Sequence, residues 1–169
     1  LDDTLRVTRA DTVILGLGVP SLVPTKGTPA ITVADVGGVT IAGLILDAGP
    51  VKSACLLEVG PSGSKADHSA NPTFLYDLTV RTGGAKAGKN DVGIQINSSH
   101  VVADQLWLWR ADHGAGAGWG DSTSRNGLVV NGRDVTVYGL FNEHHQEYQT
   151  LWNGDGGRAY RRRPARPEP

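Results

Sequence analysis

Residues 94–109 read IQINSSHVVADQLWLW, and they align without a gap with residues 128–143, which read LVVNGRDVTVYGLFNE. Apolar residues match apolar residues along the alignment, for example Val101 with Val135 and Leu106 with Leu140. Self-similarity at a fixed period is typical of solenoids, in which each unit buries its apolar side chains against its neighbours. The repeat therefore predicts a stack of similar units.

Further copies of the repeat lie upstream. In residues 39–46, VTIAGLIL, Val39 and Leu44 keep the five-residue separation of Val101 and Leu106, and a weaker copy occupies residues 74–80. The equivalent leucines give periods of 34, 28 and 34 residues, and they are Leu44, Leu78, Leu106 and Leu140. Each unit holds two short strands joined by a turn such as 36–38, 98–100 or 132–134.

The composition favours strands over helices. The chain has 23 Gly, 9 Pro and no Met, and the long 3.6-spaced apolar patterns of helical arrays do not occur in it. We therefore expect an all-β protein, a right-handed parallel β-helix of the pectate-lyase-like solenoid type with a partial set of rungs, over residues 1–160. Residues 161–169 hold four Arg and three Pro without apolar alternation, and we expect them to form a disordered tail.

Three further residues are interpreted from this pattern. Asn97 and Asn131 occupy the same turn position, where they either stack as an amide ladder or are two unrelated turn residues. Cys55 lies in an apolar run and is expected to be a buried thiol rather than a nucleophile.

Charge and hydropathy exclude some functions. The net charge of −1 gives no reason to expect a nucleic-acid or membrane partner, and no apolar stretch approaches the roughly 20 residues that span a bilayer. No signal peptide is visible, and the chain looks trimmed because it starts at Leu1.

The densest polar cluster spans residues 142–149 and begins where a repeat strand ends. Glu143 and Glu147 could act as a carboxylate pair, while His144 and His145 could transfer protons. The catalytic candidates are Glu143, Glu147, His145 and Gln146. The alternative is a hydrated loop closed by an aromatic side chain.

Neither a metal nor another cofactor is expected. Adjacent residues of a strand point to opposite faces, so His144 and His145 would not bind one ion unless the loop bends, with His113 joining from the preceding rung. No paired Cys or HExxH spacing indicates zinc.

A second cluster spans residues 107–121, WLWRADHGAGAGWGD. Trp107 and Trp109 share one strand face, and the Gly-rich loop allows Trp119 to fold back. Such tryptophans either bind carbohydrate or pack a corner of the rung. The substrate-binding candidates are Trp107, Trp109, Asp112, His113, Trp119, Tyr148 and Trp152. The loop lacks the Gly-Lys-Ser/Thr ending of a phosphate loop, and Asp112-His113 has no partnered serine in a nucleophile elbow.

Three stretches resemble one family, namely residues 11–22, residues 106–114 with 118–119, and residues 139–148 with 151–157. The family that they resemble is glycoside hydrolase family 55, whose members are exo-β-1,3-glucanases or laminarinases. The resemblance implies a secreted carbohydrate-active protein with two β-helix domains, which hold β-1,3-glucan in the groove between them and hydrolyse it with inversion. It also implies that this chain is part of the second β-helix and that Glu143 belongs to the active-site network.

The resemblance ends after Tyr160, where the family continues into an aromatic strand that ends in a glutamate proton donor. Here residues 161–169 read RRRPARPEP, and Glu168 lacks the matching context. We therefore expect a truncated, weakly active or inactive β-1,3-glucanase-type protein. The alternatives are a non-catalytic polysaccharide-binding or structural β-helix module and, more distantly, a polysaccharide lyase. Exposed rung ends also predict a homo-oligomer.

Overall fold

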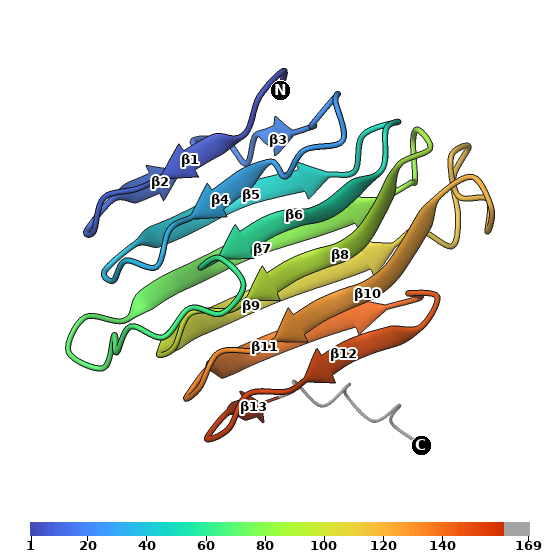
Figure 1. Cartoon of the computed structure of the whole chain (residues 1–169). Helices are drawn as coiled ribbons and strands as arrows, with labels where there is room; N and C mark the ends of the chain where they lie inside the picture. The colour runs from blue at the N-terminus through green and yellow to red at the C-terminus, as the bar shows by residue number, and fades with distance from the viewer. Residues whose placement is uncertain (161–169) are drawn as a thin grey trace.

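The structure is a computed structural model, and it describes residues 1–160. These residues form two parallel β-sheets that lie against each other, and the chain alternates between them (Figure 1). The first sheet has the order β1-β4-β6-β8-β10-β12. Its strands are β1 (Leu5–Val7), β4 (Ile31–Val33), β6 (Ser53–Val59), β8 (Lys89–Ile96), β10 (Thr123–Val130) and β12 (Tyr148–Trp152).

The second sheet has the order β13-β11-β9-β7-β5-β2, and β3 also pairs with β5. Its strands are β2 (Val13–Leu15), β3 (Ser21–Leu22), β5 (Thr40–Asp47), β7 (Thr73–Thr82), β9 (Val101–Arg110), β11 (Thr136–Glu143) and β13 (Arg158–Tyr160). The all-β class and the parallel pairing are thus confirmed, and the tail predicted at residues 161–169 lies outside the described part of the chain. No helix within residues 1–160 is long and apolar enough to cross a membrane.

The core lies between the two sheets and consists of the repeated apolar positions. The parallel register pairs Leu44 with Leu78, Leu78 with Leu106, and Leu106 with Leu140, and each of these side chains is buried. The prediction that these leucines occupy equivalent inward positions is therefore confirmed. Cys55 is also buried, as predicted, and burial raises the pKa of its thiol to about 12.

A backbone irregularity at equivalent positions of neighbouring strands in the second sheet explains the five-residue separation in the repeat. Residues five apart in a regular strand point to opposite faces, yet both members of each such pair are buried. A residue with positive φ precedes each core leucine and restores the inward direction. These residues are Gly43 (φ 67°), Asp77 (φ 48°), Gln105 (φ 55°) and Gly139 (φ 61°).

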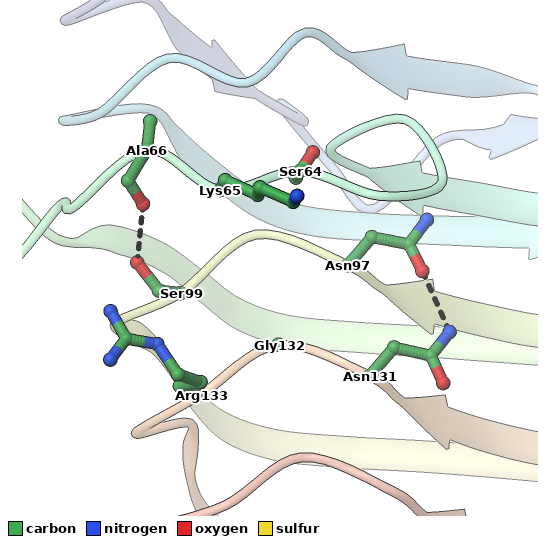
Figure 2. A pocket seen from close by; sticks show the side chains of 8 residues that line it. All are labelled: Ser64, Lys65, Ala66, Asn97, Ser99, Asn131, Gly132 and Arg133. Carbon is green, nitrogen blue, oxygen red and sulfur yellow. Dashed lines mark hydrogen bonds between the residues drawn. The ribbon is translucent and has the colours of Figure 1, made fainter.

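Asn97 and Asn131 stack as an amide ladder along the turns of successive coils, where a coil is one strand of the first sheet and the strand of the second sheet that follows it. Asn131 Nδ2 donates to Asn97 Oδ1 at 2.8 Å (Figure 2), and Asn153 Nδ2 donates to Asn131 Oδ1 at 2.8 Å. The ladder that was one of two interpretations of the turns is thus confirmed, with Asn153 as a further member.

Candidate functional site

The two predicted clusters meet at the ends of β9 and β11. These strands are neighbours in register, with Phe141 opposite Trp107 and Glu143 opposite Trp109. The Trp107 indole donates its Nε1 hydrogen to Glu143 Oε1 at 3.1 Å. The sheet thus places an acidic side chain beside an aromatic ring that belongs to the preceding coil.

The tryptophans of β9 share a face, as strand alternation predicts. Their ring centroids lie 5.7 Å apart at an interplanar angle of 24°, and the His113 ring lies 5.1 Å from Trp109 on a tilted plane. Trp107 is 46% exposed, whereas Trp109 is partly covered. Trp107 therefore presents the more open ring, and Trp109 supports it.

Two carboxylates approach one imidazole at the same surface. His144 Nε2 lies 3.7 Å from Glu143 Oε2 and 3.6 Å from Asp112 Oδ2. Asp112 Oδ1 is also 2.8 Å from His113 Nδ1, and this hydrogen bond is the main cause that lowers the pKa of Asp112. His144 has a φ of 65°, so the chain bends directly after β11. Asp112, which precedes this bend by one coil, is thereby brought near Glu143.

A pocket of about 320 Å³ lies beside these groups, and its lining includes Asp112, His144 and Trp119. The buried Arg110 also lines it, donates from Nε to the Ser122 carbonyl at 2.9 Å, and lies 4.4 Å from the Trp119 ring centroid. Arg110 thus anchors the loop between β9 and β10 and holds Trp119 at the pocket, which fits the prediction that Trp119 folds back.

Gln146 takes part in the same anchoring. Its Nε2 donates to the Trp119 carbonyl at 2.8 Å, so this side chain supports the loop that carries Trp119. The structure places Gln146 as a connector between the polar cluster and the pocket wall.

Glu147 lies away from Glu143. Its carboxylate forms a bidentate ion pair with Arg125 of β10, in which Arg125 Nε lies 2.8 Å from Oε1 and Nη2 lies 2.9 Å from Oε2. The hydrogen bonds from Arg125 lower the pKa of Glu147. The Glu147 amide donates to the Arg125 carbonyl, so the backbone at Glu147 is hydrogen-bonded to a strand of the first sheet. The hypothesis of a Glu143–Glu147 pair therefore finds no support in this geometry, and Asp112 is the carboxylate that shares a partner with Glu143.

The aromatic residues of β12 are also separated from the site. Tyr148 is exposed at the start of β12, on the first sheet, and pairs in register with Asn126. Trp152 is partly buried and packs against the core at the end of the same strand. The structure thus gives Trp152 a packing role and leaves Tyr148 on a different face from Trp107.

His145 is buried within a hydrogen-bonded chain of polar groups. Its Nδ1 lies 2.8 Å from Ser124 Oγ, its Nε2 lies 3.3 Å from the Leu108 carbonyl, and burial lowers its pKa to about 4. The chain continues from Ser124 to Asn90 and Thr82, and all four side chains are buried. This geometry favours a neutral, structural imidazole over a proton-transfer group.

Sequence reasoning missed the role of Arg110 in holding Trp119, although Arg110 lies within the Trp-Arg-Ala-Asp-His string. A buried arginine and an exposed arginine next to Asp112 give the same sequence pattern. No group of three or more His, Cys, Asp or Glu side chains that could hold a metal ion occurs in the described part of the chain.

The chain was compared with known proteins. Residues 1–163 match the family model of the LAM55 pectate lyase-like domain. The chain is 46% identical over 158 residues to an exo-β-1,3-glucanase of Streptomyces sp. (strain SirexAA-E / ActE), a match that covers 94% of this chain and 26% of that protein. This chain therefore spans about a quarter of the length of that relative.

Two solved structures from Streptomyces sp. SirexAA-E are similar to the whole arrangement of strands. SacteLam55A matches with a TM-score of 0.90 and 47% identity over 91% of this chain and 28% of that chain. A Glu-to-Ala variant of SacteLam55A in complex with glucose matches with a TM-score of 0.92 and 46% identity, over 94% of this chain and 29% of that chain.

Proposed function

The chain belongs to the family of LAM55 pectate lyase-like domains and is similar to β-1,3-glucan hydrolases, and from this membership we propose that it is a glucan-contacting domain of such an enzyme. The glucan contacts the surface formed by Trp107, Asp112, Glu143 and His144. The single observation that carries the proposal is the half-exposed Trp107 ring that donates to Glu143 at 3.1 Å.

The proposal includes the finer description of the fold, a right-handed parallel β-helix. The support is the alternation of the chain between two parallel sheets, in which each inner strand pairs with one strand from the coil before it and one from the coil after it. This topology needs no crossover helices, because the coil itself returns the chain to the same sheet. The similarity to a pectate-lyase-like domain points the same way.

Each part of this surface has a chemical role in the proposal. The flat faces of a sugar ring carry C–H groups, which pack on an indole such as that of Trp107. Carboxylates accept hydrogen bonds from sugar hydroxyls, and Glu143 and Asp112 supply two of them around His144. A glycosidase needs an acid at the leaving oxygen and a second group that acts on water or the sugar, and Glu143 is assigned to this machinery.

Binding and hydrolysis are tested separately with this chain. We expect laminari-oligosaccharides to bind, and Trp107→Ala to weaken binding about tenfold, because truncation of a tryptophan that is central to a binding surface costs more than about 1 kcal/mol. Tyr148→Ala is the matched control, since it removes an exposed aromatic ring from the other sheet. Equal loss in both variants, or no loss in Trp107→Ala, would contradict the proposed surface.

Glucose release from laminarin tests the role of Glu143. Any release by the chain should fall at least about 100-fold in Glu143→Gln, because a general acid or base contributes about 10²–10⁴-fold. The same substitution at Glu147 is the control, because Glu147 is bound to Arg125. Robust turnover that is insensitive to Glu143→Gln would assign the chemistry to other residues.

A non-catalytic polysaccharide-binding module is the second candidate. The observation that favours it is the ion pair of Glu147 with Arg125, which holds this predicted catalytic carboxylate away from Glu143, whereas hydrolysis needs two cooperating groups. Binding with no detectable release would support this candidate. Secretion of the protein remains a prediction from the family resemblance.

A further inference from the structure

A second pocket lies at the opposite edge of the sheets from the Trp107–Glu143 surface. It has a volume of about 330 Å³, and its walls come from the loop after β6, the turn after β8 and the turn after β10 (Figure 2). Strand β9 separates the two places, since it starts at Val101 beside this pocket and ends at Arg110 beside the other. A strand of that length spans about 30 Å.

The upper wall of this pocket is fixed by a hydrogen-bond network around the partly buried Asp35. Asp35 accepts the backbone amides of Lys65 and Ala66, each at 3.0 Å, and the His68 ring at 2.8 Å. Burial opposes ionisation of Asp35, but these hydrogen bonds outweigh it and lower the pKa of the carboxyl to about 2. Ser99 Oγ donates to the Ala66 carbonyl at 2.8 Å, as the dashed line in Figure 2 shows. The loop is therefore held in place without a ligand.

Two cationic side chains stand at this pocket, Lys65 from the loop and Arg133 from the turn after β10. Neither forms an ion pair with any residue from 1 to 160. The neighbouring carboxylates have other partners. Asp35 accepts from backbone amides and the His68 ring, and His100 Nε2 lies 3.2 Å from Asp67 and 3.8 Å from Asp134. The positive charges thus remain available to a ligand.

The rest of the lining supplies neutral polar groups. The Asn97 and Asn131 amides form one wall and the Ser64 and Ser99 hydroxyls contribute to another. Most of these groups already donate to protein acceptors. Ser64 Oγ donates to the Pro61 carbonyl, Ser99 Oγ to the Ala66 carbonyl and Asn97 Nδ2 to the Gly60 carbonyl. The two cationic side chains are therefore the main groups that attract a ligand here, and no aromatic side chain of the described residues lines the pocket.

We propose that this pocket, which Lys65 and Arg133 line, binds an oxyanion group, such as the carboxylate of an acidic sugar or a free inorganic sulfate. An oxyanion matches the two cationic side chains, because guanidinium and ammonium groups form their shortest hydrogen bonds with anionic oxygens. A neutral glucan unit would find no aromatic ring for stacking. The site is separate from the Trp107–Glu143 surface, so it stands whether or not that surface binds glucan.

The test is a titration of the whole chain with sodium sulfate, sodium glucuronate and glucose at constant ionic strength, followed by amide NMR shifts. We expect sulfate and glucuronate, but not glucose, to shift the amides of Lys65, Ala66, Gly132 and Arg133. Lys65→Ala and Arg133→Ala should each weaken the binding about tenfold, since each removes one charge-assisted contact. Lys52→Ala is the matched control, because Lys52 is paired with Asp91 at 2.9 Å.

Each outcome is decisive. Tighter binding of glucuronate than of sulfate identifies an acidic sugar as the source of the oxyanion, and sulfate binding alone identifies a free inorganic anion. Glucose shifts equal to those of glucuronate, no shifts with either anion, or equal losses in Lys52→Ala and Arg133→Ala would overturn the proposal. Both variants alter exposed side chains, so little change in folding is expected, and unchanged amide spectra without ligand confirm this.

Discussion

Two histidines of this protein differ in role because one is exposed and the other is buried. His144 and His145 are adjacent, yet His144 lies at the surface near Asp112 and Glu143, whereas His145 is buried against Ser124 and the Leu108 carbonyl. A buried imidazole is held neutral, because charging it in an apolar interior costs free energy.

The pKa of His145 predicts a pH dependence of stability. The value of about 4 lies below the ordinary value of 6.5, so between these values the unfolded chain binds more protons than the folded chain. The contribution of His145 is therefore fully present above pH 6.5 and is lost as the pH falls towards 4. Its size is about 3 kcal/mol.

Urea unfolding of the wild type and of His145→Gln at several pH values checks this prediction. The variant should lose much of the decrease in unfolding free energy between about pH 6.5 and 4. His113→Gln is the control, since the His113 side chain is 79% exposed. An identical pH dependence in the wild type and in His145→Gln would contradict the buried, neutral assignment.

At the scale of elements, the residues of positive φ in the second sheet have a structural function. Gly43, Asp77, Gln105 and Gly139 each stand one position before a core leucine, and two of them carry side chains in a conformation that favours glycine. A left-handed conformation costs a residue with a side chain roughly 1–2 kcal/mol. The sheet tolerates that cost because the irregularity keeps both halves of each strand directed inward.

Opposite substitutions at two of these positions should change stability in opposite directions. We expect Gly139→Ala to lower the free energy of unfolding by about 1–2 kcal/mol and Gln105→Gly to leave it unchanged or raise it by up to about 1 kcal/mol. Denaturant unfolding measures both. Gly120→Ala is the control, because a Cβ added there meets no atom within 4 Å. Destabilisation by Gln105→Gly as large as that by Gly139→Ala would argue against a conformational cause.

At the scale of the whole molecule, the edge formed by β2 and by the segment between β2 and β3 exposes several apolar side chains. Val13, Leu15, Leu17 and Val19 are each more than half exposed, and β2 is the outermost strand of the second sheet in the described order. Exposed strand edges with apolar side chains favour association between copies.

We therefore predict concentration-dependent self-association of the chain, which sedimentation velocity can measure. Leu17→Lys should shift the distribution towards the monomer, because a charge at an apolar edge opposes pairing. Lys26→Ala, a change at another exposed position, should leave the distribution unchanged. A single monomeric species of the wild type across a wide concentration range would contradict the prediction.

The sequence by itself determined the repeat, the strands and the inward leucines. These follow from local patterns, since strand alternation and a fixed period decide which side chains meet in the core. The Asn97–Asn131 ladder was accessible for the same reason, because both residues hold one position in successive units. The resemblance that the tryptophan and glutamate strings carry also came from the sequence alone, and the family match confirms it.

Only the tertiary structure decided which polar groups come together. Glu143 and Glu147 are close in sequence, but the chain leaves one sheet for the other between them, while Asp112 approaches from the preceding coil. Lys65 and Arg133 are likewise brought to one pocket by three successive turns. Such contacts depend on how coils stack and how the loops between them bend, and the spacing of residues along the chain does not contain that information.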